Sequence, residues 1–347
     1  MPEPISSSLT APVAQSELNG FLGLIEALGI ARCAQLIADF CIADALDDAP
    51  ATAAEVAARA GVNADALGRV MRYAVTFGVF EEAGEGRFRH TVRSRLLRSD
   101  HPQSLQGYTR LLGPSWPVFG ALDHSLRTGR SAVEALAPGG VWEWLSANPH
   151  FAKVFDLAMA SKARGDLATV LAAYDFSRFR SFADIGGGQG HLLRAVLDNV
   201  PDATGTLFDQ PAVVDPMRDR LGNRMSGVGG DFFKDTLPRA DAYLLMHVIH
   251  DWDDEHAVAI LRKMRSAAPT RAKLLLIEVL LPQTSQPVRE ASRPAWPAFL
   301  HFSMLAWSSG QERTSGEYER LLDASGWRLE RVVPTESFMS ILEAAPV

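Results

Sequence analysis

The chain has 347 residues, of which 47% are hydrophobic and 22% are charged. This balance is typical of a soluble globular protein and argues against disordered, collagen-like and coiled-coil chains, and the length favours two domains. With 34 basic and 41 acidic residues, the formal net charge is −7. We therefore do not expect a general binder of nucleic acids, because phosphate contacts need a concentrated basic surface.

The N-terminal residues show no targeting segment. They lack the basic start, apolar core and cleavage site of a signal peptide, and we expect the apolar runs to be too short to span a bilayer. The two cysteines, Cys33 and Cys41, lie in an apolar helical stretch without a CxxC pair or a histidine cluster, which argues against a disulfide framework and a zinc site. We predict a cytoplasmic protein.

The first hundred residues are predicted to be mainly helical. Residues 18–46 repeat apolar side chains at helical spacing over a broad surface, which indicates helices buried against a partner. A helix over Thr52–Ala60 begins at an N-cap threonine with Glu55 three residues later, the pattern of a capping box, and Gly61 ends it. A second helix is expected over residues 64–77.

These two helices and a short hairpin over residues 79–89 are typical of a winged helix-turn-helix. DNA binding is one interpretation of this pattern. However, residues 1–110 contain ten arginines, no lysine and thirteen acidic residues, and the second helix offers only Arg69 and Arg72 for reading bases. We favour a dimerisation domain over residues 1–110, and a ligand-responsive DNA-binding regulator is the alternative.

The second half of the chain changes its periodicity. Residues 107–172 are helical and rich in aromatic side chains, which either roof a ligand pocket or form ordinary core. Beyond Phe179, short apolar strands alternate with helices, which predicts a doubly wound, mostly parallel α/β sheet. The expected strands are residues 181–185, 205–208, 227–230, 242–248, 273–279, 328–333 and 338–342, and an irregular insert spans residues 282–297.

The sharpest motif is the glycine-rich run Gly186–Gly190, which follows the first of these strands and precedes a helix over His191–Asn199. Glycines there allow a tight turn and let a ligand approach the backbone. The glycines are spaced GxGxG, and His191 stands where a dinucleotide fold would carry its last glycine. This spacing argues against NAD.

Acidic residues follow the next two strands. Asp209 ends the second strand, 25 residues after Asp184, where a carboxylate can accept both ribose hydroxyls. Asp231 and Phe232 follow the third strand. In this order and at this spacing, the residues predict a nucleoside site.

At this point the sequence resembles the class I S-adenosylmethionine-dependent small-molecule O-methyltransferases, which include plant caffeate-type enzymes and bacterial antibiotic and pigment enzymes. The resemblance covers nearly the whole chain and implies a Rossmann-like sheet of seven strands, the last one antiparallel, with an N-terminal winged-helix-like dimerisation domain. It implies that the glycine loop holds the methionine part of the cofactor, Asp209 the ribose, and Asp231 with Phe232 the adenine. The cofactor-binding residues expected in full are Asp184, Gly186, Gly188, Asp209, Gln210, Asp231 and Phe232.

The catalytic residues are expected at the end of the fourth strand, which the sequence pattern extends from Tyr243 to His250. Methyl transfer to a phenol is helped by a base, because a phenol is mostly protonated at neutral pH, and histidine suits that proton transfer. Glu278 ends the fifth strand, and Glu312 precedes a helix that starts near Gly316. The resemblance assigns His250 as general base, with Glu278 and Glu312 flanking and orienting it.

Other residues near the motif are expected to be structural. His247 lies an odd number of positions from His250 along the predicted strand, so it should face the opposite side. Asp251 is also expected to be structural. The spacing of the histidines and acidic residues matches neither a zinc site nor a magnesium site. A lysine that some relatives carry four residues before the catalytic histidine is Met246 here.

An apolar pocket for a planar aromatic acceptor is expected from several helices. Its predicted residues are Trp116, Phe155, Met159, Phe299, His301, Met304 and Trp307. Relatives commonly carry an acid at the position of His301. The imidazole here either touches the substrate, acts as a second base, or is a neutral core substitution.

The sequence thus predicts a cytoplasmic homodimeric O-methyltransferase of an aromatic or polyketide-like hydroxyl, with S-adenosylmethionine as methyl donor, S-adenosylhomocysteine as product, and no metal. We expect a dimerisation domain over residues 1–110, a helical connector over residues 111–175 that contributes to the substrate pocket, and a catalytic domain over residues 176–347. The alternative within the same scaffold is hydroxylation, decarboxylation or a pericyclic reaction, which the presence of His250 and both glutamates disfavours.

Overall fold

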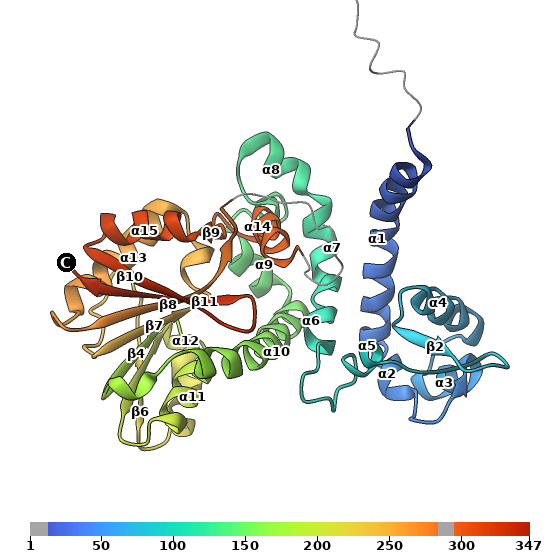
Figure 1. Ribbon diagram of the computed structural model, residues 1–347, viewed down its shortest axis with the longest axis horizontal. Coiled ribbons are helices and arrows are strands. Elements are labelled where there is room, and N and C mark those ends of the chain that lie inside the picture. Colours follow the sequence, from blue (N-terminus) through green and yellow to red (C-terminus); the bar gives the residue numbers. More distant parts are fainter. Residues whose placement is uncertain (1–12, 284–294) are drawn as a thin grey trace, which may run out of the picture. The chain divides into compact units, whose positions relative to one another are not determined.

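The computed structural model describes residues 13–283 and 295–347, and the chain divides into two compact units (Figure 1). Unit 1 contains the residues up to Pro114 together with Lys153–Ser161, and unit 2 contains Ser115–Ala152 and Lys162–Val347. The larger part of the predicted irregular insert, residues 284–294, lies outside the described residues.

Unit 1 is a helical unit with a small sheet. Its helices are α1 (Gln15–Asp39), α2 (Ile42–Ala45), α3 (Ala53–Ala60), α4 (Ala64–Thr76), α5 (Val92–Arg95) and α6 (Gln106–Arg110), and its strands, in the sheet order β1-β3-β2, are β1 (Ala51–Thr52), β2 (Phe80–Glu82) and β3 (Arg87–His90). Thr52 and Glu55 form the predicted capping box of α3, and Gly61 follows it with a φ of 68°. The core buries Ile37, Met71 and Phe88.

Helix α1 carries an apolar surface that the described residues leave uncovered. Phe21, Leu24 and Leu28 are 65%, 71% and 65% exposed. The helix has 25 residues and contains an 18-residue window with a mean hydropathy of 1.6, so by length and composition it could cross a membrane. The expectation that the apolar runs are too short for this is therefore wrong, although core helices of soluble proteins have the same properties.

Unit 2 is a doubly wound α/β unit. Its strands are β4 (Ser181–Ile185), β5 (Thr204–Asp209), β6 (Met225–Gly229), β7 (Ala242–Met246), β8 (Lys273–Leu281), β9 (Arg313–Thr314), β10 (Trp327–Pro334) and β11 (Met339–Pro346). Its helices are α8 (Leu122–Thr128), α9 (Val141–Ala147), α11 (His191–Asn199), α12 (Pro211–Val214), α13 (Asp254–Ala267), α14 (Trp296–Trp307) and α15 (Ser315–Ala324), with the 3-10 turns η2 (Ala132–Ala135), η3 (Phe176–Arg178), η4 (Asp215–Arg220) and η5 (Ile249–Asp251). Helices α7 (Leu112–Gly120) and α10 (Pro149–Ala173) contribute to both units.

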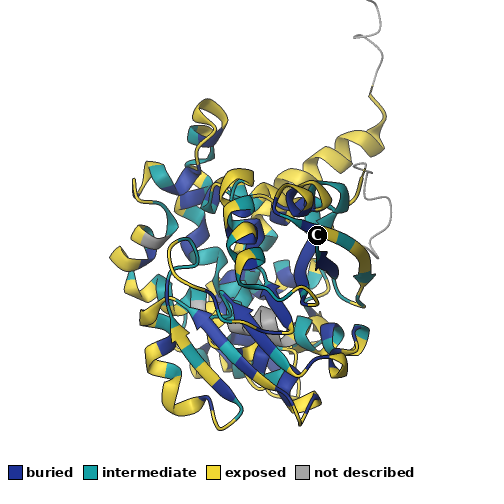
Figure 2. Ribbon diagram, turned by 90° about the vertical axis from the view of Figure 1, so that its left-hand side faces the viewer, coloured by how far each residue is buried: buried dark blue, intermediate teal, exposed yellow. Residues whose placement is uncertain are grey.

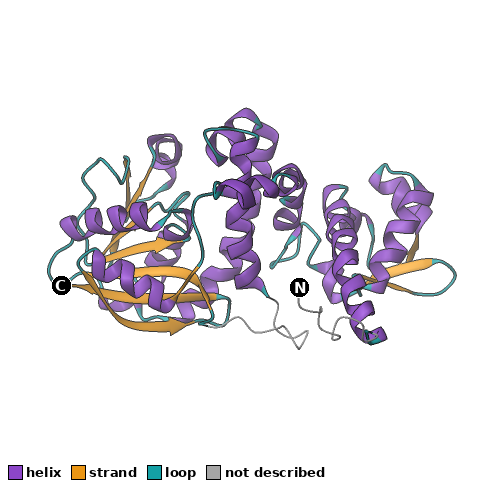
Figure 3. Ribbon diagram, turned by 90° about the horizontal axis from the view of Figure 1, so that it is seen from above, coloured by secondary structure: helices purple, strands orange, loops and turns teal. Residues whose placement is uncertain are grey.

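The main sheet of unit 2 has the strand order β6-β5-β4-β7-β8-β11-β10, with β9 paired to β8. The pairs from β6 to β8 are parallel, whereas β11 runs antiparallel to β8. This arrangement is the Rossmann-like mixed sheet that the sequence predicts (Figure 3).

Successive residues of the central strands pack against opposite faces of the sheet. Phe182 and Leu244 share one core cluster with α11, whereas Ala183 and Tyr243 share the other with α13 and α15. The central strands are accordingly buried on both faces (Figure 2). The loops after parallel strands therefore project from one edge of a fully covered sheet, where open α/β folds bind ligands.

Strand β7 ends earlier than the sequence pattern indicates. It stops at Met246 and not at His250, because His247 adopts a left-handed conformation with a φ of 55° and turns the chain out of the sheet. His250 consequently lies in the 3-10 turn η5, beyond the carboxyl end of the strand.

Candidate active site

The glycine loop after β4 is built for close backbone approach. Gly186, Gly188 and Gly190 have φ values of 69°, 58° and 72°, which side-chain-bearing residues rarely adopt. A Cβ on Gly187 would overlap the Oδ2 atom of Asp184 and lie 2.6 Å from a methyl group of Leu207. The loop can therefore follow this path only with glycines at these positions.

Asp184 lies beneath this loop. Its residue is 1% exposed, and its Oδ2 atom has no hydrogen-bond partner among the described residues. Burial raises the pKa of its carboxyl to about 7, against the hydrogen bond from the Leu193 backbone, which lowers it. Asp184, predicted to bind the cofactor, thus packs under the glycine loop as a support for it.

Asp209 joins the ends of two strands. Its Oδ2 atom accepts a hydrogen bond from the Gly188 N–H at 2.8 Å, and its Oδ1 atom accepts one from the Gln210 N–H at 2.7 Å. The carboxylate at the end of β5 is thereby fixed beside the glycine loop of β4. Each carboxylate oxygen has two acceptor sites, so both retain the capacity to accept a ribose hydroxyl.

Asp231 and Phe232 follow β6 at the same edge of the sheet. Asp231 accepts a hydrogen bond from the Phe233 N–H at 2.9 Å and pairs with the Lys234 ammonium at 2.8 Å. Lys234 and the Phe233 N–H hold the pKa of this carboxyl below its usual range. Phe232 meets the Trp252 ring edge-on, with centroids 5.8 Å apart, so the two predicted ends of the site adjoin.

His250 is buried in η5 and points its ring toward two buried glutamates. Its Nδ1 atom is 2.9 Å from Glu312 Oε1 and 3.9 Å from Glu278 Oε2. The Nε2 atom is 3.5 Å from Asp251 Oδ1. The structure therefore brings together the three residues predicted to form the catalytic centre.

Glu278 holds the backbone turn that carries His250. Its residue is fully buried on β8, and its Oε1 atom accepts hydrogen bonds from the N–H groups of Val248 and Ile249 at 3.2 and 2.9 Å. Burial raises the pKa of the Glu278 carboxyl to about 7. These two N–H donors provide part of the stabilisation that a buried carboxylate requires.

Glu312 reaches His250 because Gly310 packs directly on the turn that carries His250. A Cβ at position 310 would overlap the carbonyl oxygen of His250 and the backbone of Asp251. Three residues later, β9 pairs with β8 through Arg313 and Leu280. Glu312 is thus held between a close backbone contact and a strand pair.

Two opposing effects determine the proton affinity of His250. Burial lowers the pKa of the imidazole, but Asp251, Glu278 and Glu312 outweigh burial and raise the pKa to about 9. The hydrogen-bonded imidazole–carboxylate pair is the arrangement that fixes the ring and stabilises its protonated form in proton-transfer sites.

The comparisons with known proteins identify the family. Residues 119–328 match the O-methyltransferase domain, and residues 22–100 match the O-methyltransferase dimerisation domain. The chain belongs to this family. It is an S-adenosylmethionine-dependent O-methyltransferase.

Individual relatives agree with this assignment. Phenazine O-methyltransferase of Lysobacter antibioticus is 37% identical to the methyltransferase over 332 residues, which are 94% of this chain and 95% of the relative. The crystal structure of LaPhzM aligns with a TM-score of 0.86 at 37% identity, over 96% of this chain and all of that chain. An O-methyltransferase from neocarzinostatin biosynthesis, in complex with S-adenosylmethionine and 2-hydroxy-5-methyl naphthoic acid, aligns with a TM-score of 0.76 at 31% identity, covering 92% and 96% of the chains.

His247 occupies a place in the methyltransferase that the sequence pattern does not predict. Its ring centroid is 5.3 Å from that of His250, and its Nε2 atom is 3.7 Å from Asp166 Oδ2. The prediction that His247 faces away from His250 is wrong, because strand alternation ends at Met246. The alternation of side chains along a strand could place His247 correctly only if the left-handed turn at this residue were known in advance.

His247, His250 and Glu278 form a group with possible metal-ligand atoms within 4.8 Å of one another. The fold brings this group together from the turn after β7, from η5 and from β8. The Nδ1 atom of His250 is already hydrogen-bonded to Glu312, so in this conformation the group is arranged for a proton.

The predicted pocket residues fall into different environments. Met304 and Trp307 share one face of α14 with the buried Leu300, at the spacing i, i+4 and i+7. His301 is exposed, one residue and about 100° around the helix from Leu300. The half-buried Trp116 belongs to unit 2, whereas Phe155 and Met159 belong to unit 1, and Phe299 is 40% exposed. Their common role in a pocket stays a prediction.

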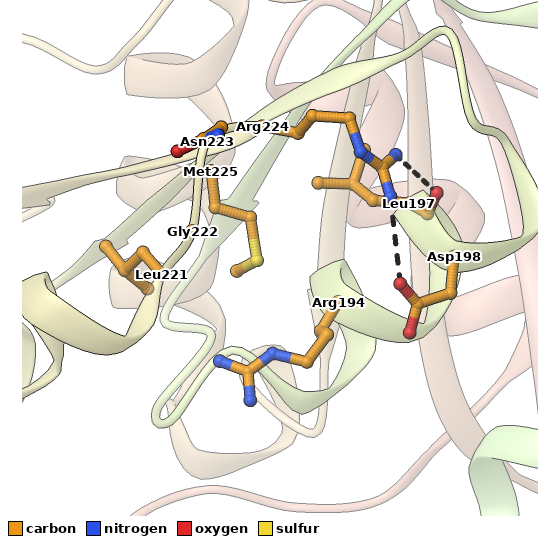
Figure 4. A pocket seen from close by; sticks show the side chains of 8 residues that line it. All are labelled: Arg194, Leu197, Asp198, Leu221, Gly222, Asn223, Arg224 and Met225. Atoms are coloured by element: carbon orange, nitrogen blue, oxygen red, sulfur yellow. Dashed lines mark hydrogen bonds and ion pairs between the residues drawn. The ribbon is translucent and has the colours of Figure 1, made fainter.

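A separate pocket lies at the opposite edge of the sheet, where β6 begins (Figure 4). It is lined by Arg194, Leu197, Asp198, Leu221, Gly222, Asn223, Arg224 and Met225. The Arg224 guanidinium donates to the Leu197 carbonyl at 2.5 Å and pairs with Asp198 at 3.7 Å. This pocket is therefore separate from the edge that carries His250.

Proposed function

We propose that the methyltransferase transfers the methyl group of S-adenosylmethionine to a hydroxyl group of an aromatic or polyketide-like small molecule, in the biosynthesis of a secondary metabolite. The observation that carries this proposal is the 2.9 Å hydrogen bond between His250 and Glu312, at the sheet edge that also carries the glycine loop. The phenazine and naphthoate names of its relatives support a planar aromatic acceptor.

We assign cofactor binding to the loops after the first three parallel strands of unit 2. Gly186 and Gly188 provide the backbone cradle, supported from below by Asp184. Asp209, with the neighbouring Gln210, is placed for the ribose hydroxyls, and Asp231 with Phe232 is placed for the adenine. When bound, S-adenosylmethionine supplies an electrophilic methyl group on a sulfonium sulfur.

In this mechanism His250 removes the proton of the acceptor hydroxyl. Because Nδ1 lies on Glu312, the neutral tautomer carries its hydrogen there and leaves the Nε2 lone pair to accept the hydroxyl proton. The acceptor oxygen gains nucleophilicity as this proton leaves. A bound S-adenosylmethionine would supply the methyl carbon for the new bond to oxygen, and the bond from that carbon to sulfur would break to leave S-adenosylhomocysteine. Alignment of oxygen and methyl group in a dry pocket provides most of the acceleration.

The carboxylates around His250 have separable roles. Glu312 stabilises the imidazolium through its hydrogen bond at Nδ1, and Glu278 orients η5 through its bonds to backbone N–H groups. Asp251, whose side chain is 46% exposed and 3.5 Å from Nε2, stabilises the imidazolium from the other nitrogen and is placed to pass the proton to solvent. No step in this mechanism requires a metal.

We further propose the organisation in which this chemistry operates. Residues 1–110 form the dimerisation domain of a homodimer, residues 111–175 contribute to the acceptor pocket, and residues 176–347 form the catalytic domain. Trp116, Phe155, Met159, Phe299, His301, Met304 and Trp307 are the pocket candidates. A cytoplasmic enzyme without nucleic acid or membrane partners fits the net charge of −7.

Mass spectrometry tests the reaction class. Wild-type enzyme, S-adenosylmethionine and a panel of phenols, hydroxynaphthoates, hydroxyphenazines and polyketide hydroxyl compounds are incubated together. The expected result is a gain of one methyl group in an acceptor, matched by S-adenosylhomocysteine. A product with any other mass change, formed with the same cofactor, would overturn methyl transfer in favour of the alternative chemistries.

A further inference from the structure

A buried arginine lies next to Glu312 and contacts the turn that carries His250. Arg313 is 1% exposed, and its guanidinium lies over the Tyr318 ring at 5.9 Å from the ring centroid. We propose that Arg313 is a positioning residue for the general base, holding the His250 turn against the Glu312 segment. This inference rests on the proposed role of His250 in methyl transfer.

The guanidinium contacts the base-bearing turn on both sides of His250. Its Nη1 atom donates to the Ile249 carbonyl at 3.2 Å, and its Nη2 atom donates to the Trp252 carbonyl at 2.7 Å. Ile249 and Trp252 enclose His250 and Asp251 in the sequence. A single side chain therefore fixes the carbonyl group before His250 and the carbonyl group after Asp251.

The same guanidinium is tied to its own segment and to the next helix. Nη1 also donates to the Gln311 carbonyl at 3.3 Å, adjacent to Glu312. Nε and Nη2 donate to Asp254 Oδ1 at 3.0 and 2.8 Å, in the first turn of α13. Asp254 thereby neutralises a buried charge that would otherwise be costly.

This arrangement complements the contacts of Glu278. Glu278 accepts from the N–H groups of Val248 and Ile249, so the turn is held by a carboxylate on its N–H side and by a guanidinium on its C=O side. The Ile249 carbonyl already accepts the Trp252 N–H at 3.2 Å within the turn, and Arg313 adds a second donor to it and a donor to the Trp252 carbonyl just beyond the turn. Since Glu312 directly precedes Arg313, these contacts set the distance between the imidazole and its carboxylate.

Lysine cannot reproduce this geometry. A guanidinium presents five N–H donors in a rigid planar fork, whereas an ammonium is a compact point charge. Arg313→Lys therefore keeps the charge next to Asp254 but loses several carbonyl contacts. Arg320→Lys is the matched control, because Arg320 lies on α15 with 72% side-chain exposure and a single ion pair to Glu317.

The kinetic experiment compares wild type, Arg313→Lys and Arg320→Lys with an accepted phenol. We expect Arg313→Lys to lower kcat by about 10-fold to 100-fold, the effect of a small displacement of reacting groups. The acceptor KM and the S-adenosylmethionine Kd should stay within about twofold of wild type, because Arg313 contacts the base-bearing turn. Arg320→Lys should behave as wild type.

An NMR titration of the histidine ring nitrogens tests the geometry without turnover. The titratable groups around His250 are Asp251, Glu278, Glu312 and His247. A loosened Glu312 contact should lower the pKa of His250 in Arg313→Lys by about one pH unit. If Arg313→Lys does not fold, Asp254→Asn provides the second variant, and a smaller shift in the same direction is expected.

Folded Arg313→Lys with wild-type kcat and an unchanged His250 pKa would overturn the inference, and so would equal losses of kcat and cofactor affinity. Failure of the proposed function is distinguishable from this result. In that case wild type would produce no methylated acceptor, whereas the titration would still report whether Arg313 holds the imidazole against Glu312.

Discussion

At the residue scale, the proposed general base is an imidazole surrounded by several carboxylates. Three acids raise the pKa of His250 to about 9 although burial lowers it. A histidine with this pKa is mostly protonated near neutral pH, whereas a general base must be neutral. In the proposed mechanism the carboxylates orient the imidazole and stabilise the imidazolium, and a smaller fraction of His250 is therefore in the active neutral form at neutral pH.

The pH dependence of turnover follows from this environment. We predict that kcat/KM of the wild type rises with pH as His250 loses its proton and levels off only above the His250 pKa of about 9. Glu312→Gln removes a group that raises the His250 pKa, so the rising limb should move to lower pH while the maximal rate falls. The rate of S-adenosylhomocysteine formation between pH 6 and 10 measures both effects. An unmoved limb would show that another group titrates.

Gly310 is a second residue whose effect can be predicted. In Gly310→Ala the new Cβ meets backbone atoms of His250 and Asp251, which cannot move aside like a flexible side chain. We expect kcat to fall by about 100-fold because the base-bearing turn is displaced. Gly316→Ala is the matched control, since its nearest neighbour would be Gln283 Nε2 at 3.8 Å. Equal activities of the two variants would contradict the proposed contact.

At the element scale, local signals in the sequence were sufficient where one residue type defines a boundary. The capping box of Thr52 and Glu55 correctly predicts the start of α3, and the predicted helix over His191–Asn199 agrees with α11. The end of β7 was not predictable in this way. Val248 and Ile249 continue the apolar run, and histidine is not a residue from which a left-handed turn is inferred.

The glycine loop can be tested as an element. In Gly187→Ala the added Cβ would overlap Asp184, a side chain that the surrounding core prevents from moving. We predict at least about a 10-fold weaker S-adenosylmethionine affinity by calorimetry, because the loop must change its path. Gly165→Ala on α10, where no atom lies within 4 Å of the added Cβ, should bind as wild type. Wild-type affinity of Gly187→Ala would argue against this loop as the cofactor site.

At the scale of the whole molecule, the sequence predicted the residues of the site better than the tertiary contacts that hold them in place. His250, Glu278 and Glu312 were predicted because the family resemblance assigns them, and the structure brings them together. His247 was misplaced because strand alternation ends at Met246. The support from Arg313 was not predicted because its contact with Ile249 joins segments more than sixty residues apart. Such contacts follow from tertiary packing and leave no periodic pattern.

The exposed face of α1 predicts the oligomeric state. Ile25 is 61% exposed among other apolar side chains of this helix, and the matched dimerisation domain includes it. We expect light scattering to give a dimeric mass for wild type and a monomeric mass for Ile25→Glu, because an interfacial charge loses its water. Leu126→Glu, at a residue with 85% exposure on α8, should remain dimeric. A monomeric wild type would contradict the proposed homodimer.

The division of roles between His250 and the glycine loop is tested most directly by His250→Ala. We would measure methyl transfer by mass spectrometry and S-adenosylmethionine affinity by calorimetry in the same preparations. His256→Ala, at a histidine with 51% side-chain exposure on α13, is the control. We predict a loss of turnover of about 10²-fold to 10⁴-fold with cofactor affinity unchanged. Equal losses of turnover and affinity, or full turnover without the imidazole, would contradict His250 as the general base.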